Sequence, residues 1–189
     1  MAKQKVPGLV FHTDAVQSFG KVQLPTSLSA VDLVSVSAHK VGGPKGVGAL
    51  IILNKNLLKN GLRPLVWGGE QEGGFRSGTQ NAGLIAGFHA AAEQTLSKQE
   101  ESCRKIQELN RRLRELLVSR QLLAPAKGPG GHPGKLTWNS PANAVPHIIN
   151  LSIPGFPSAP LSKLLEERGC LVSTGSACTT GSTEPSHVL

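Results

Sequence analysis

The chain of 189 residues is 39% hydrophobic and 17% charged, with 22 glycines and 13 prolines. This composition predicts a folded, turn-rich protein of one ordinary domain or two small ones, and it excludes a disordered chain or a disulfide-stapled peptide. The 20 Lys and Arg residues against 12 Asp and Glu give a formal charge of +8, which favours anionic ligands without identifying them.

No apolar run reaches the roughly 20 residues that a membrane span requires, and the opening residues MAKQKVPG lack the apolar stretch of a signal peptide. We therefore expect a cytoplasmic protein that does not enter a membrane. The three cysteines, Cys103, Cys170 and Cys178, form no CxxC pair. A thiolate metal site is accordingly not expected, and at least one thiol should be free.

Three apolar runs in the first part of the chain predict strands, at 8–14, 31–37 and 46–53. Each is apolar over most of its length, which is typical of strands buried on both faces of a parallel or mixed sheet. Glycines between the last two runs predict a tight reversal there.

Apolar residues recur at a helical period from 81 to 117. Ser97 and Glu100 have the spacing of a capping box, which would divide this segment into two helices. Lysines and arginines alternate with glutamates from 98 to 120, as on a solvated helix face. This alternation and the scarcity of aromatic residues argue against nucleic-acid binding.

The rest of the chain predicts a small α/β lobe. Five prolines and four glycines at 124–147 predict a long loop with a short strand near Leu136. A strand at 148–153, a helix at 161–168 ended by Gly169, and a strand at 171–173 are expected to follow.

Two chemistry-bearing residues stand at the ends of expected strands. Asp14 ends the first strand, and Lys40 follows the second. A partly desolvated lysine is a nucleophile toward carbonyls, and a nearby aspartate keeps a pyridine nitrogen protonated, as pyridoxal phosphate requires. The spacing by itself also fits a surface lysine after a strand and an aspartate in a turn. On spacing alone, that arrangement is the commoner of the two.

Four motifs in one order carry a resemblance to a known family. HTDAVQSFGK at 12–21, SVSAHKVGGPKGVGAL at 35–50, GGEQEGGFRSGTQN at 68–81 and STGSACTTGSTEPSHVL at 173–189 resemble the cysteine desulfurases. These are pyridoxal-phosphate enzymes of the class V aminotransferase group, to which the selenocysteine lyases are related. The motifs extend over nearly the whole chain.

The resemblance implies a role for individual residues. Lys40 is similar to the lysine that carries the cofactor and moves protons at the substrate. Asp14 resembles the partner of the pyridinium nitrogen, and Gln17 the donor to the phenolic oxygen. Ser37 and His39 resemble residues that hold the cofactor phosphate, and Thr79 one that reaches that phosphate from the second subunit of a homodimer.

Cys178 resembles the nucleophilic cysteine of this family. A thiolate there would take sulfur from substrate L-cysteine, which leaves alanine and an enzyme persulfide. Small and polar residues surround Cys178, which suits a sulfur-carrying loop. Cys170 precedes an apolar pair and is expected to be buried, and Cys103 is expected to be incidental.

The implied fold is α/β. It comprises part of the pyridoxal-phosphate transferase large domain, a mostly parallel sheet with helices, at 1–93, and a connecting helix with a small C-terminal α/β domain at 94–189. The implied function is sulfur transfer to acceptor proteins such as an iron-sulfur scaffold, in the cytoplasm or, in a eukaryote, the mitochondrial matrix.

An alternative reading stays open. The family's chains extend beyond this one at both ends and include a substrate-carboxylate arginine that has no counterpart here. The isolated chain is therefore expected to turn over very slowly. It is then a catalytically silent interaction module, or one half of a split enzyme that a separate chain completes.

Overall fold

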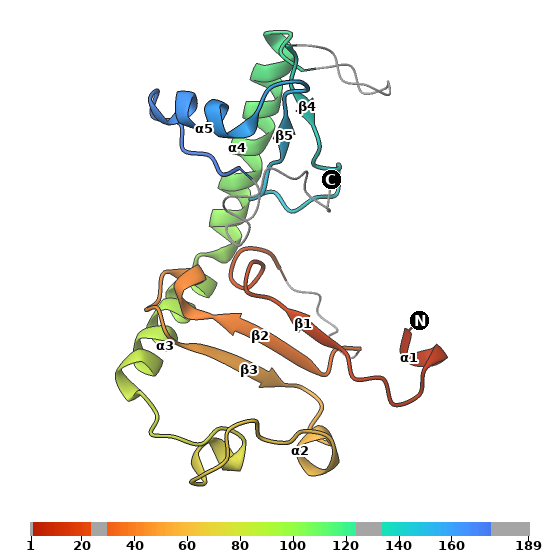
Figure 1. The fold of residues 1–189 in the computed structure, drawn as a ribbon, viewed down its shortest axis with the longest axis vertical. Coiled ribbons are helices and arrows are strands. Elements are labelled where there is room, and N and C mark those ends of the chain that lie inside the picture. Colours follow the sequence, from red (N-terminus) through yellow and green to blue (C-terminus); the bar gives the residue numbers. More distant parts are fainter. Residues whose placement is uncertain (1, 24–29, 124–133, 175–189) are drawn as a thin grey trace. The chain divides into compact units, whose positions relative to one another are not determined.

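The computed structural model describes residues 2–23, 30–123 and 134–174 (Figure 1). By internal contacts the chain divides into two units, 1–104 and 105–189. The boundary between the two units lies within helix α4 (Gln99–Ser119). The domain boundary expected from the sequence, between 93 and 94, lies within helix α3 (Ala82–Ser97).

The first unit contains a three-stranded sheet in the order β1 (His12–Asp14), β2 (Leu33–Ser37), β3 (Gly48–Ile52) (Figure 1). Strand β1 pairs with β2 in parallel, and β2 pairs with β3 antiparallel. The three expected strands are therefore present, but each is shorter than its apolar run. The sheet is mixed, because the reversal at 42–47 returns the chain alongside β2.

The core of the first unit lies against β2. Buried Ala15, Val34 and Val36 pack together, with half-buried Phe19, Val31 and Phe88 around them. Phe88 belongs to α3, which also contacts the 3-10 turn η1 (Ala38–Val41) after β2. The Thr95 hydroxyl donates to the Val41 carbonyl at 3.1 Å. Helix α3 thus supports the turn that carries Lys40.

Strand β3 is less well covered. Leu50 and Ile51 of β3, and Leu53 just after it, are large and apolar but 51%, 41% and 41% exposed. In the described part of the chain, β3 pairs only with β2 and forms one edge of the sheet. An edge of this kind offers unpaired backbone groups and apolar side chains to a further segment of polypeptide.

Two helices occupy the segment where a helical period was expected, and they meet at Lys98. The expected capping box is wrong in its details, because Ser97 ends α3 and its hydroxyl donates to the Gln94 carbonyl of the same helix at 2.9 Å. Helix α3 begins at a cap instead, where the Asn81 side chain accepts from the Leu84 amide. Two short helices, α1 (Ala2–Lys5) and α2 (Leu57–Asn60), were not expected.

The second unit contains an antiparallel pair, β4 (Thr137–Trp138) and β5 (Leu151–Ser152), and helix α5 (Ser158–Glu166). Gly169 adopts φ 77° just after α5, as expected of a glycine that ends a helix. The strand expected at 171–173 is wrong: the segment has no regular structure. Leu171 is 82% exposed, and no strand within the described residues pairs with this segment.

Within the described segments, no helix combines the length and the apolar character needed to cross a membrane.

Asp32 is the main buried charge of the first unit, at 2% exposure. Its Oδ2 accepts from Lys3 Nζ at 2.7 Å and from the Phe11 amide at 2.7 Å, and its Oδ1 accepts from Asn54 Nδ2 at 2.8 Å. These donors, the Lys3 hydrogen bond foremost, lower the pKa of Asp32 from 3.8 to about 2. The carboxylate therefore joins three separate segments to the start of β2.

This depressed pKa predicts an acid-sensitive fold. The stabilisation is complete above the ordinary pKa of 3.8 and is lost as the pH falls through about 2. In urea unfolding measured between those limits, we expect the midpoint to fall with pH. Asp32→Asn should lower the midpoint at neutral pH and remove most of this dependence, whereas Glu101→Gln, at an exposed site, should retain it. Equal pH dependence in both variants would contradict the role of Asp32.

Candidate functional site

Strands β1 and β2 bring polar residues to the same end and the same face of the sheet. Asp14 is paired in register with Ser35, and His12 Nε2 lies 2.7 Å from Ser35 Oγ. Because alternate residues of a strand share a face, Asp14 lies on the face of His12, and Ser37 on that of Ser35. The Asp14 carboxylate is exposed, and its Oδ1 accepts from the Val16 amide at 2.9 Å.

The turn after β2 carries the expected lysine. Ser37 precedes η1, and its Oγ lies 2.8 Å from His39 Nδ1. Lys40 is half-buried within η1, and His39 is exposed. Gly42 ends the turn at φ 83°, a conformation that favours glycine, and the Gly43 amide closes it by donating to the Ala38 carbonyl. The turn is thus a defined structure that carries Lys40 directly after the paired Ser37 and His39.

A second lysine lies near Lys40. Lys21 Nζ donates to Gln17 Oε1 at 3.3 Å. Partial burial lowers the pKa of Lys21, and so does the positive charge of Lys40. The turn before Lys21 also meets η1, since a Cβ at Gly20 would lie 3.3 Å from Val41 Cγ1, and Gln17, Lys21 and Lys40 therefore share one neighbourhood. No role is expected for Lys21 from the residue types alone, although its position four residues after Gln17 within the HTDAVQSFGK motif is a usable signal.

Thr79 stands apart from this group. It is exposed, in the loop between the 3-10 turn η2 (Gln71–Gly74) and α3, and no hydrogen bond joins it to another described residue. The loop holds its own shape, since Ser77 Oγ donates to the Gly69 carbonyl at 2.8 Å and the Gly78 amide to Gln71 Oε1 at 3.1 Å. The role expected for Thr79, in the site of a second subunit, stays a prediction.

The predictions for the three cysteines have different outcomes. Cys178 lies outside the described residues, so its expected role stays a prediction. Cys170 is exposed, and the expectation that it would be buried is wrong. It lies shortly after α5, where its amide donates to the Leu165 carbonyl at 2.9 Å. Cys103 is half-buried on α4.

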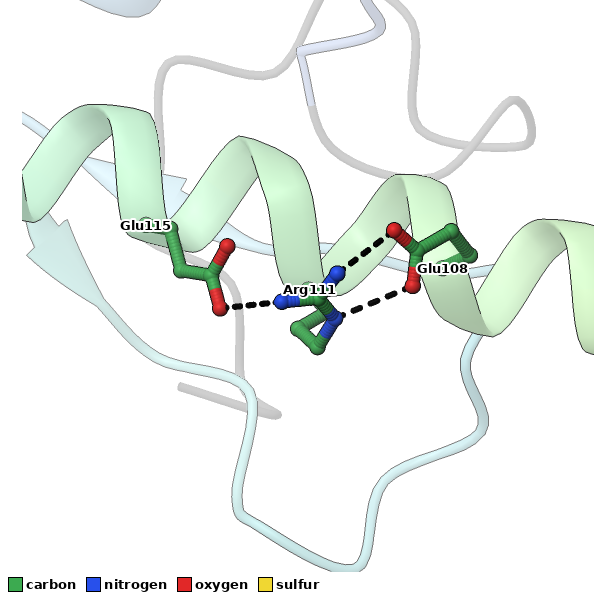
Figure 2. A network of polar contacts seen from close by, with 3 residues as sticks. All are labelled: Glu108, Arg111 and Glu115. Carbon is green, nitrogen blue, oxygen red and sulfur yellow. Dashed lines mark hydrogen bonds and ion pairs between the residues drawn. The ribbon is translucent and has the colours of Figure 1, made fainter.

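The charged face of α4 forms local ion pairs. Arg111 Nη1 contacts Glu115 Oε1 at 2.5 Å, and its Nη2 and Nε contact Glu108 at 2.6 and 3.0 Å (Figure 2). These contacts lower the pKa of Glu108. Their spacing of three and four residues is that of pairs on one helix, as expected for a solvated face.

A pocket of about 350 Å³ lies within the second unit, between α4 and the segment 138–148. Arg114 stacks on Trp138, 5.2 Å from the ring centre, and Asn110 donates to the Pro146 carbonyl at 2.9 Å. Arg111, which also lines it, already has two carboxylate partners. The contacts of these side chains are thus internal to the unit, and we assign the pocket no role in the site.

The residues at the end of β1 and β2 fit pyridoxal phosphate in their chemistry. The cofactor has an aldehyde, a pyridine nitrogen, a phenolic oxygen and a phosphate. The lysine amine, the exposed carboxylate of Asp14, the side-chain amide of Gln17 and the paired Ser37 and His39 offer one matching group to each. All come from two segments of the first unit, 14–17 and 37–40.

Comparison with known proteins identifies the family. The family model described as Aminotransferase class-V matches residues 1–189, and the chain belongs to that family. The curated proteins that it resembles include a cysteine desulfurase of Gluconacetobacter diazotrophicus, 37% identical over 96% of this chain and 42% of that protein. The cysteine desulfurase NifS of Azotobacter vinelandii is also 37% identical, over 96% of this chain and 42% of NifS. The chain thus spans less than half the length of these relatives.

Solved structures agree. A NifS-like protein superposes with a TM-score of 0.74 at 32% identity, over 91% of this chain and 43% of that one. A structure described as SspA in complex with cysteine gives a TM-score of 0.62 at 32% identity, over 95% of this chain and 45% of SspA. These likenesses confirm the expected fold class and the resemblance to cysteine desulfurases.

Proposed function

We propose that this chain carries part of the active site of a cysteine desulfurase, in which L-cysteine is converted to L-alanine with pyridoxal phosphate as cofactor. The observation that carries the proposal is that the chemistry-bearing side chains lie at one end of the sheet. These are Asp14 and Ser37 at the ends of β1 and β2, and Gln17, Lys21 and Lys40 in the turns that follow them. The names of the relatives support it, and so does the cysteine in the SspA structure.

Each residue contributes a distinct action. The cofactor, when bound, withdraws electrons from the amino acid attached to it. The Lys40 amine would bind the aldehyde carbon and then carry protons to and from the substrate carbons. The Asp14 carboxylate would hold a proton on the ring nitrogen, because a nearby negative charge favours the protonated form. Ser37 and His39 would bind the phosphate, with Thr79 of a second copy of the chain completing that contact.

The sulfur step assigns a role to Cys178. Its thiolate would attack the sulfur of bound L-cysteine, so that a sulfur-sulfur bond forms while the carbon-sulfur bond breaks. The electron pair of the broken bond stays with the substrate carbon, which takes up a proton to become alanine. The products are one L-alanine and one cysteine persulfide, so substrate and thiol are consumed one to one and no external oxidant is needed.

The partners we propose follow from this product. A persulfide is a sulfur donor, so an acceptor protein such as an iron-sulfur scaffold would consume it. The proposed assembly is a homodimer, in which each Thr79 serves the other site. The compartment we propose is the cytoplasm, or the mitochondrial matrix in a eukaryote.

A second candidate is favoured by the exposed edge of the sheet. Leu50, Ile51 and Leu53 offer β3 to a further segment, and the relatives contain more than twice the polypeptide present here. In this candidate, the chain is silent by itself and acts as one half of a site that additional polypeptide completes.

One assay tests both candidates. The chain is incubated with pyridoxal phosphate, L-cysteine and a thiol reductant, and alanine and sulfide are measured, with D-cysteine as the control substrate. A second arm adds the part of Azotobacter vinelandii NifS that this chain does not match. We expect alanine and sulfide in equal amounts from L-cysteine only. Release in the second arm alone supports the half-site candidate, and release in neither arm contradicts both.

A further inference from the structure

Thr95 of α3 lies between the two turns that carry the candidate site residues. Its hydroxyl donates to the Val41 carbonyl in η1 at 3.1 Å, across 54 positions of the sequence. Its methyl carbon Cγ2 faces the turn after β1, because a Cβ added at Gly20 would lie 2.5 Å from that carbon. One half-buried side chain therefore contacts both the turn of Lys40 and the turn that follows Asp14.

The hydrogen bond of Thr95 is unusual for a hydroxyl on a helix. Serine and threonine in helices commonly bond to a carbonyl of the preceding turn, as Ser97 does to Gln94 at 2.9 Å and Ser119 to Leu116 at 3.0 Å. The Thr95 hydroxyl instead leaves its own helix and bonds to the turn after β2. This bond therefore connects α3 to another segment rather than strengthening the helix itself.

The two turns also meet each other. A Cβ at Gly20 would lie 3.3 Å from Val41 Cγ1, and Gly20 is buried. Partial burial and then the positive charge of Lys40 lower the pKa of Lys21, which agrees with this close approach. Because protein interiors are close-packed, a shift of either turn requires a matching shift of the other turn and of Thr95.

This connection matters because of the residues that lie next to each turn. Lys40 directly precedes Val41, and Asp14 directly precedes the turn at 15–21. The proposed function needs the Lys40 amine and the Asp14 carboxylate at a fixed separation, since they would bind two groups of the same rigid ring. A displacement of about 1 Å between reacting groups lowers reaction rates by as much as roughly a hundredfold.

We propose that Thr95 is a positioning residue of the cofactor site, whose hydroxyl holds the Lys40 turn against the turn after Asp14 and so fixes the orientation of pyridoxal phosphate between them. The inference rests on the proposed function and extends it to a residue of α3 that lies outside the four motifs. Thr95 acts through the Val41 carbonyl rather than by contact with the cofactor.

The test compares two variants that each remove one part of the Thr95 side chain. Thr95→Val keeps its shape and removes the donor, and Thr95→Ser keeps the donor and removes the methyl group that faces Gly20. Pyridoxal phosphate is titrated by visible absorbance, and the circular dichroism of the same band reports whether the ring is held in one orientation. We expect Thr95→Val to weaken binding roughly fivefold, which corresponds to about 1 kcal/mol, and to reduce the dichroism per bound cofactor. Thr95→Ser should retain most of both.

Ser97→Ala is the matched control, because it removes a hydroxyl of the same helix whose hydrogen bond stays within that helix. It should match the wild-type affinity and dichroism. Hydrogen exchange of the amides at 38–43, measured without cofactor, reports on the turn by itself, and we expect Thr95→Val to increase that exchange. Thermal unfolding verifies that each variant is folded, and Thr95→Ala replaces Thr95→Val if the latter does not fold.

The outcomes separate this inference from the proposed function. Wild-type affinity and dichroism in Thr95→Val would overturn the inference and leave the proposed function intact, even if the variant melts earlier or exchanges faster. Equal losses in Thr95→Val and Thr95→Ser would also overturn it, since only the first lacks the hydroxyl, and so would an equal loss in Ser97→Ala. A wild-type chain that acquires no band, by itself or with the remaining part of a NifS relative, would contradict the proposed function and the inference with it.

Discussion

Substitution of Lys40 by alanine is expected to abolish the visible absorption band that the chain acquires with pyridoxal phosphate. Lys40 is half-buried in η1, the turn that also contains His39, and its loss removes the only amine that the proposal assigns to the aldehyde. Absorbance titration measures the effect, and borohydride reduction followed by peptide mass mapping locates the modified lysine.

Lys45→Ala is the matched control for this experiment. Lys45 is an exposed lysine in the same glycine-rich segment, and its removal should leave the band intact. A band that persists in Lys40→Ala, or a label found at Lys45 rather than Lys40, would contradict the assignment. Melting temperatures compared without cofactor exclude unfolding as the cause of a lost band.

Substitution of Cys178 by serine is expected to abolish persulfide formation and leave cofactor binding unchanged. Serine keeps the size of the side chain but has no sulfur to form the sulfur-sulfur bond, and its hydroxyl is a much weaker nucleophile than a thiolate. The chain is incubated with pyridoxal phosphate and L-cysteine, with the remaining part of a NifS relative if turnover requires it. Mass spectrometry then detects the extra sulfur atom.

The other two cysteines provide demanding controls. Cys170 is exposed and lies close to Cys178 in the sequence, so it is the thiol most able to form a persulfide in place of Cys178. We expect Cys170→Ser and Cys103→Ser to form persulfide at the wild-type level. A persulfide that survives Cys178→Ser and is lost in Cys170→Ser would move the sulfur-carrying role to Cys170.

Sequence patterns correctly predicted those helices and strands whose signal lies within a single segment of the chain. The apolar runs located β1, β2 and β3, and the helical period located α3 and α4, because these signals arise within one segment. The motif containing Asp14 and Gln17 and the motif containing Ser37, His39 and Lys40 also indicated the chemistry. The prediction of a strand at 171–173 was wrong for the opposite reason. A strand needs a neighbouring strand to pair with, and the composition of one segment does not show whether such a partner is present.

Residue types and their order thus sufficed to predict the family, which the comparisons confirm, and to suggest the cofactor and the reacting groups that we propose. Two features were decided only by the tertiary structure: the exposure of Cys170 and the approach of Lys21 to the turn that carries Lys40. Each depends on contacts between segments that are separate in the sequence. The packing of α3 against the turns at Gly20 and Gly43 brings such segments together, and no local periodicity encodes that distance.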